Sequence, residues 1–99
     1  MIRGTTPTLT FTIPFDTKYL AEAFITLAQN KKVVLEKSLA DCTLDGNLMS
    51  VRLTQAETLE LESGAITEIQ LRVRTLEGEA LASDIIVENT KRVLKDGEI

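Results

Sequence analysis

The chain has 99 residues, of which 43% are hydrophobic and 26% charged, and its 15 acidic and 11 basic side chains give a net charge of −4. This length and composition are typical of one globular core, so we expect a single domain over residues 1–99. The negative charge repels phosphate backbones and anionic headgroups, which argues against nucleic acid and membrane surfaces as partners.

Two residue types that carry much protein chemistry are scarce: there is no histidine and one cysteine, Cys42. Without histidine, a histidine-based triad, a histidine metal site and a pH switch near neutrality are excluded. We interpret Cys42 as a buried structural thiol, which fits a reducing compartment. No apolar run long enough to cross a membrane and no secretory signal is present, so we expect the cytosol as the place of synthesis.

The first seven residues are predicted to form an extended arm, because Gly4 and Pro7 disfavour a helix. Such an arm is suited to pairing with a neighbouring chain. Over residues 9–15, apolar residues alternate with threonines, which predicts a half-buried strand with its threonines facing solvent.

Residues 19–29 fit two patterns, since their apolar side chains also follow helical spacing. We favour a strand, with Ala21, Ala23, Ile25 and Leu27 on one face and Phe24 on the opposite face. The pair Asn30-Lys31 then predicts a tight hairpin turn into residues 33–35.

Residues 38–43 are predicted to be irregular, and we expect Cys42 and Leu44 to point inward. A turn at residues 45–47 precedes a strand over residues 48–53. Thr54 and Glu57 then fit a capping box, which predicts one helical turn over residues 55–59.

The cleanest alternation in the chain, over residues 66–75, predicts the central strand. A hairpin at residues 76–79 leads to a strand over residues 80–88, with Leu81, Ile85 and Val87 inward. The tail, residues 89–99, is either a last short strand or a loose end.

Together these elements predict an all-β fold, an antiparallel β-sandwich of immunoglobulin-like layout with about seven strands and one helical turn. The predicted core consists of Leu9, Phe11, Ile13, Ile25, Leu27, Val33, Leu35, Met49, Val51, Leu53, Ile69, Leu71, Val73, Leu81 and Ile85.

No constellation of residues predicts catalysis, a metal ion or a cofactor. The acidic pairs lack the fixed separation of a glycosidase and the ligand spacing of a calcium loop. Arg72 and Arg74 project from one face of the central strand, where they either clamp an anion or form a solvated row beside acidic neighbours.

Several segments resemble a family of small proteins encoded in prophages of Gram-positive bacteria. They are residues 1–8, 13–16, 28–30, 41–47, 53–58 and 80–85, so the likeness runs along nearly the whole chain. The strand layout also resembles, more faintly, the β-sandwich modules of phage baseplate proteins. The resemblance implies a non-enzymatic phage structural or accessory protein without cofactors.

On this basis we expect a virion or tail assembly component that associates with itself and docks to other phage structural proteins. It would be made in the host cytoplasm, with the virion as its later location. The expected contact residues are Thr5, Thr6, Phe24, Arg72 and Arg74, because edges and exposed aromatics are the surfaces that a β-domain offers. The alternative is an accessory module that binds a host protein, as an inhibitor, or a cell-wall sugar.

Overall fold

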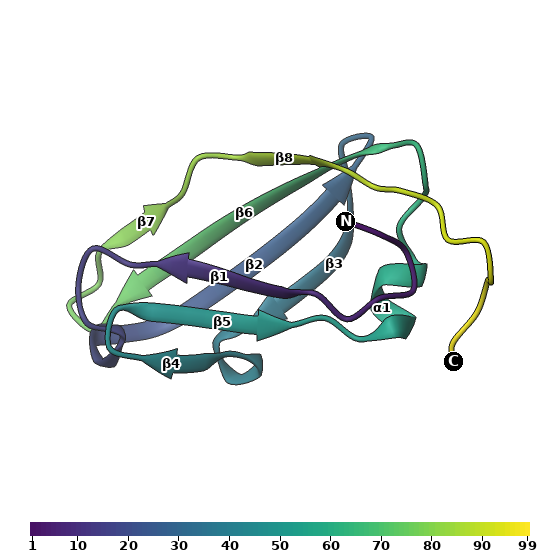
Figure 1. Cartoon of the computed structure of the whole chain (residues 1–99). Coiled ribbons are helices and arrows are strands. Elements are labelled where there is room, and N and C mark those ends of the chain that lie inside the picture. The colour runs from purple at the N-terminus through teal and green to yellow at the C-terminus, as the bar shows by residue number, and fades with distance from the viewer.

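The computed structural model describes residues Met1–Ile99 as two antiparallel β-sheets that stack face to face (Figure 1). The front sheet has the order β1-β5-β4, with β1 at Thr8–Thr12, β5 at Leu48–Arg52 and β4 at Thr43–Asp45. The back sheet has the order β3-β2-β6-β7, and β8 also pairs with β6. Its strands are β2 (Leu20–Gln29), β3 (Lys32–Ser38), β6 (Ile66–Thr75), β7 (Ala80–Ala82) and β8 (Ile86–Asn89).

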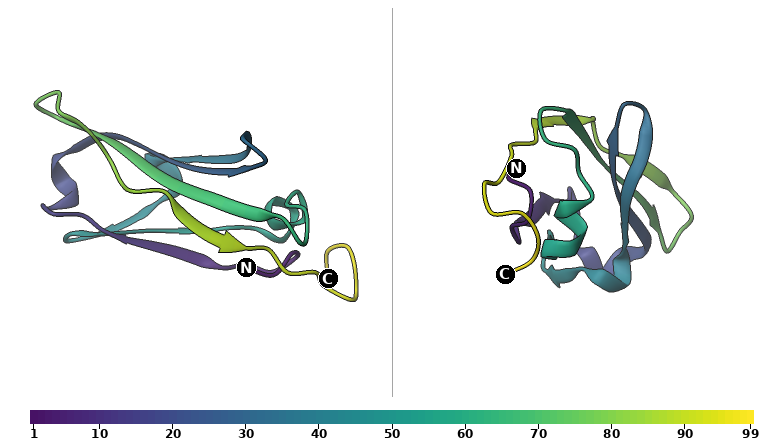
Figure 2. Two further views of the ribbon diagram at one scale, coloured as in Figure 1. Left: turned by 90° about the horizontal axis from the view of Figure 1, so that it is seen from above. Right: turned by 90° about the vertical axis from the view of Figure 1, so that its right-hand side faces the viewer.

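This architecture confirms the predicted all-β, antiparallel sandwich, with eight strands where about seven were expected. The immunoglobulin-like layout remains a prediction. The views from above and from the end show the two layers and the helical turn at one end of the sandwich (Figure 2).

Strand β6 is the centre of the back sheet, as its alternation predicts. It pairs antiparallel with β2 along most of its length and with β7 and β8 on its other side. The assignment of residues 19–29 to a strand is confirmed, because β2 pairs with both β3 and β6. The β2–β3 turn lies at Asn30 and Lys31, whose φ angles of 52° and 62° are those of a tight hairpin.

The helical elements are short: two 3-10 turns, η1 (Thr17–Tyr19) and η2 (Leu39–Asp41), and one helical turn, α1 (Gln55–Leu59). The predicted capping box is present. The Glu57 backbone N–H donates to Thr54 Oγ1 over 3.2 Å, and the Thr54 N–H donates to Glu57 Oε1 over 2.8 Å. No helix has the length and apolarity needed to cross a lipid bilayer.

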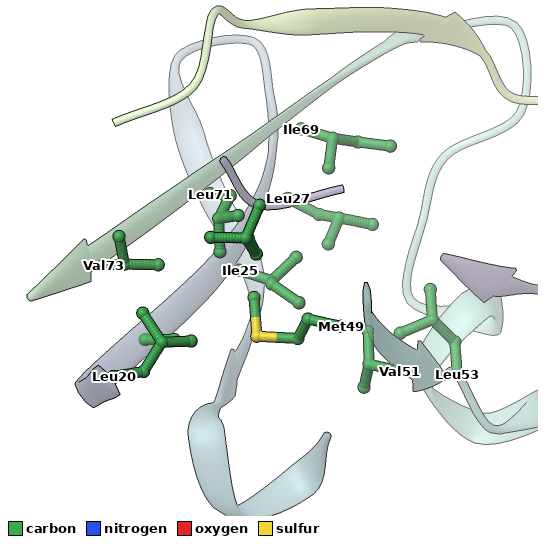
Figure 3. Packing of buried hydrophobic residues seen from close by; sticks show 11 residues of the cluster. Leu20, Ile25, Leu27, Met49, Val51, Leu53, Ile69, Leu71 and Val73 are labelled. Atoms are coloured by element: carbon green, nitrogen blue, oxygen red, sulfur yellow. The ribbon is translucent and has the colours of Figure 1, made fainter. Parts of the chain in front are cut away.

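Eleven buried side chains fill the space between the sheets (Figure 3). Nine of them were predicted: Ile13, Ile25, Leu27, Met49, Val51, Leu53, Ile69, Leu71 and Val73. The predicted Leu9, Phe11 and Leu35 are partly buried and pack against this cluster. The inward faces of β2, β5 and β6 therefore form the core, since alternate residues of each strand point to the same side.

Three predicted core residues are exposed instead. Val33 is 63% exposed because the pairing of β2 with β3 shifts register after Leu27, which turns Val33 to the outer face opposite Ala28. Leu81 has the inward register, opposite Val73, but no strand of the front sheet covers it. Ile85 lies between two strands and is exposed.

The strand predicted over residues 80–88 is broken into β7 and β8. Ser83 fixes the break, because its backbone N–H donates to Leu71 O over 2.8 Å while its Oγ accepts from Leu71 N over 3.0 Å. After this break Val87 pairs with Glu68 and faces outward, so its predicted inward orientation is wrong.

The segment predicted to be irregular at residues 38–43 contains η2 and leads into the short strand β4. Leu44 pairs with the buried Met49 and so has the expected inward register, but it is 41% exposed, and Cys42 is only partly buried. Strand β4 is an edge strand of three residues, which leaves little sheet to cover either side chain.

The arm pairs within its own chain. Ile2 forms a parallel bridge with Lys91, and Arg3 N donates to Lys91 O over 3.1 Å. Arg3 also donates from Nε to Leu61 O over 2.7 Å and from a terminal nitrogen to Leu59 O over 2.8 Å. The arm is thus held against the end of α1 and the segment after β8.

Candidate functional site

The outer face of the back sheet carries three of the five residues that the sequence predicts as contact residues: Phe24, Arg72 and Arg74. We call it the Phe24 face, and it consists of Glu22, Phe24 and Thr26 of β2, Glu36 of β3, and Gln70, Arg72 and Arg74 of β6. These residues point outward because they alternate with the buried positions of the same strands.

Phe24 lies near the middle of this face and is 40% exposed. In the sheet its neighbours are Arg72 on β6 and Ser38 on β3. A shallow hollow of about 170 Å³ lies on the β6 side of the ring, and a second of about 390 Å³ on the β3 side, lined in part by Leu39 and Ala40. The ring therefore stands between two depressions.

The charges of the Phe24 face are only partly paired. Arg74 and Glu22 lie 3.5 Å apart, and both side chains are about half exposed, so this ion pair contributes little to stability. Arg72 on one side of β2 and Glu36 on the other are exposed and form no ion pair within the chain. Each is free to meet an opposite charge on a partner.

Thr5 and Thr6 lie away from this face. Thr5 Oγ1 donates to Ile2 O over 2.6 Å within the arm, and Thr6 Oγ1 accepts from Arg52 of the front sheet over 3.3 Å. Both threonines are exposed. The five predicted contact residues therefore form two separate surfaces, the Phe24 face and the arm.

Cys42 is poorly placed to act as a nucleophile. Burial and the nearby Asp41 raise the pKa of its thiol, and the Sγ donates to Ser38 O over 3.3 Å. The backbone N–H of Ser38 lowers the pKa of Asp41 by donating to its carboxylate over 2.9 Å. No three acidic or cysteine side chains gather closely enough to hold a metal ion.

Sequence reasoning missed a buried polar network between β2, β6 and the segment after β8. Gln29 donates from Nε2 to Glu62 O over 3.0 Å and to Thr67 Oγ1 over 3.1 Å, and its Oε1 accepts from Glu62 N over 2.8 Å. Thr67 Oγ1 lies 2.6 Å from Thr90 Oγ1. With every group bonded, the network is structural and leaves no free polar atom for a ligand.

A second missed feature is an apolar groove of about 300 Å³ between the end of β1 and β7. We call it the seam. It is lined by Thr12, Ile13, Pro14, Phe15, Leu71, Val73, Leu81, Ala82 and Ser83. The groove lies where the three-stranded front sheet leaves β7 uncovered, and the width of a sheet is not evident from a local sequence pattern.

Comparisons with protein-family models, with curated proteins and with solved structures found no match to this chain.

Proposed function

We propose that this chain is a non-enzymatic structural component of a phage particle, in the virion or its tail, that acts by associating with itself and with other phage proteins. The observation that carries the self-association is the Phe24 face, where an exposed aromatic ring lies between two hollows and beside unpaired charges of opposite sign. The phage context comes from the sequence resemblance.

The charges on this face favour pairing with a second copy. A two-fold axis parallel to β2 would exchange the two sides of the strand, so that β6 of one copy lies over β3 of the other. Arg72 of each copy would then lie near Glu36 of its partner, because these residues occupy neighbouring rows on opposite sides of β2. Phe24 of each copy would pack near the centre, where an aromatic anchor contributes most.

The first test is the solution mass, measured by light scattering coupled to size exclusion over a hundredfold range of dilution. We expect an oligomer that persists on dilution. The substitution Phe24→Asp should convert it to a monomer without altering the far-ultraviolet circular dichroism or the melting temperature, because the exposed ring contributes little to the core.

The matched control is Leu94→Asp, which places the same charge on another exposed apolar residue, in the tail and away from the face. It should leave the mass unchanged. An oligomer that survives Phe24→Asp would remove this face from the proposal. A monomer of the native chain at every concentration would favour the alternative, a monomeric module that binds a host protein or a cell-wall sugar.

A further inference from the structure

We propose that the seam, together with the free edge of β1, receives one extended strand from another protein, with apolar side chains at alternate positions and basic side chains between them. The proposal specifies the partner to which the chain docks, and so rests on the proposed assembly role only for the statement that such a partner exists. The surface itself is separate from the Phe24 face.

The backbone of β1 has an unpaired edge with three sets of donors and acceptors. Ile13 N donates to Asn47 O over 2.7 Å and Leu53 N donates to Pro7 O over 2.9 Å, so the odd-numbered residues of β1 direct their backbone groups toward β5. The N–H and C=O groups of Thr8, Thr10 and Thr12 therefore point away from β5. They form no backbone hydrogen bond within the chain.

The inner face of the back sheet is not covered by the front sheet beyond the free edge of β1. The front sheet is three strands wide, whereas the back sheet continues past β6 to β7 and β8. In Figure 1 the segment from β7 to β8 lies beyond the free edge of β1. As a result Leu81 and Ile86, which pair with the buried Val73 and Ile69 and share their inward register, are 41% and 47% exposed. A strand added to β1 would cover them.

The partner's chemistry follows from the walls of the seam. The floor and sides are mostly apolar, which requires apolar side chains at every second position of the entering strand. The intervening side chains of that strand face solvent, where the net charge of −4, to which the unpaired Glu79 and Asp84 beside β7 contribute, favours basic over acidic residues.

A second copy is a poor occupant of this site. Antiparallel pairing of two β1 edges would bring the β7–β8 segments of both copies to the same side of the joined sheet, where they would collide. The β7–β8 segment therefore disfavours antiparallel edge pairing of two copies and favours a single added strand.

The probe is a blocked synthetic nonapeptide with valine at alternate positions and lysine or threonine between them, titrated by calorimetry and by amide chemical shifts. We expect saturable binding together with slower hydrogen exchange at the amides of Thr8, Thr10 and Thr12. A peptide of the same composition with its valines contiguous, and one with glutamate for lysine, should each bind about tenfold more weakly or not at all.

The decisive variant is Thr10→Pro, which removes one outward N–H and no backbone bond to β5, and which an edge strand tolerates. It also removes the 3.1 Å contact between Thr10 Oγ1 and Ser50 Oγ, which Thr10→Val removes equally. It should weaken peptide binding by about tenfold or more, whereas Thr10→Val should bind as the native chain does. Leu81→Glu supplies a second test, on the β7 side of the seam, and should abolish peptide binding.

Absence of binding at about 1 mM peptide, or binding that both variants leave unchanged, would overturn the proposal. Thr10→Pro and Leu81→Glu should not alter the solution mass, and Phe24→Asp should not alter peptide binding. Failure of this proposal is therefore distinguishable from failure of the self-association.

Discussion

At the scale of single residues, the ion pair between Lys37 and Glu57 links β3 to α1. Both side chains are largely buried, at 15% and 20% exposure. Lys37 lies opposite Ile25, so its side chain starts on the core side of β3 and reaches α1. The same Glu57 carboxylate accepts from the Thr54 N–H through its other oxygen, so one side chain serves both the cap and the bridge.

This ion pair makes the free energy of unfolding depend on pH in the acidic range. Burial raises the pKa of Glu57, but the bonds from Lys37 and Thr54 outweigh burial and leave the pKa below its ordinary value of 4.5. The contribution of Glu57 is therefore complete above pH 4.5 and is lost as the pH falls through the lower folded value. Asp41, whose pKa is also lowered, acts in the same direction.

We expect Glu57→Gln to lower the free energy of unfolding at pH 7 by about 1–3 kcal/mol, because it leaves Lys37 without its counter-charge. Urea unfolding between pH 7 and pH 3 measures this. The loss should shrink as the pH falls, since the native carboxylate is then protonated as well. The double variant with Lys37→Met should recover part of the loss, and a loss that is constant with pH would show that the charge is not its cause.

At the scale of elements, the β2–β3 hairpin contains a strained residue. Asn30 and Lys31 both have positive φ, which asparagine tolerates better than lysine. The substitution Lys31→Gly should stabilise the fold by about 0.5–1 kcal/mol, measured by thermal or urea unfolding. Lys32→Gly, in the adjoining strand, should be destabilising, and a loss of stability in Lys31→Gly would mean that the turn has a different conformation in solution.

Alternation along the chain predicted the strands because it depends on local sequence. It placed β2 and β6 correctly, and the capping box located α1, since each pattern lies within one element. Alternation failed where a neighbouring strand determines whether a side chain is buried. Val33 faces outward because of a register shift against β2, and Leu81 is exposed because the front sheet is too narrow to cover it.

The buried polar network could not be predicted for the same reason. Gln29 and Thr67 occupy the same alternate positions as the buried residues of β2 and β6, so alternation places them inward, but it does not supply the partners that satisfy their polar groups. Their partners come from segments far apart in the chain, including the backbone of Glu62. Of the candidate site, the outward position of Phe24, Arg72 and Arg74 followed from alternation, whereas the hollows beside Phe24 and the seam depend on how the sheets meet.

At the scale of the whole molecule, Arg3 joins three parts of the chain that are distant in sequence. Its guanidinium donates to the carbonyls of Leu59 and Leu61 at the end of α1, and a third bond of 3.1 Å reaches Asp96 in the tail. The planar fork of arginine is what allows one side chain to serve several acceptors at once. Arm, helix and tail are thereby held at one end of the sandwich, away from the core of β2 and β6.

We therefore expect Arg3→Lys to loosen this end without unfolding the sheets. The free energy of unfolding should fall by about 1–3 kcal/mol, because a lysine reaches fewer of the three acceptors. Amide exchange should accelerate in residues 1–6 and 91–99, and limited proteolysis should cut there first, while the amides shared by β2 and β6 stay protected. A uniform acceleration of exchange would instead mean that the arm is part of the cooperative core, and that the two sheets are not stable without it.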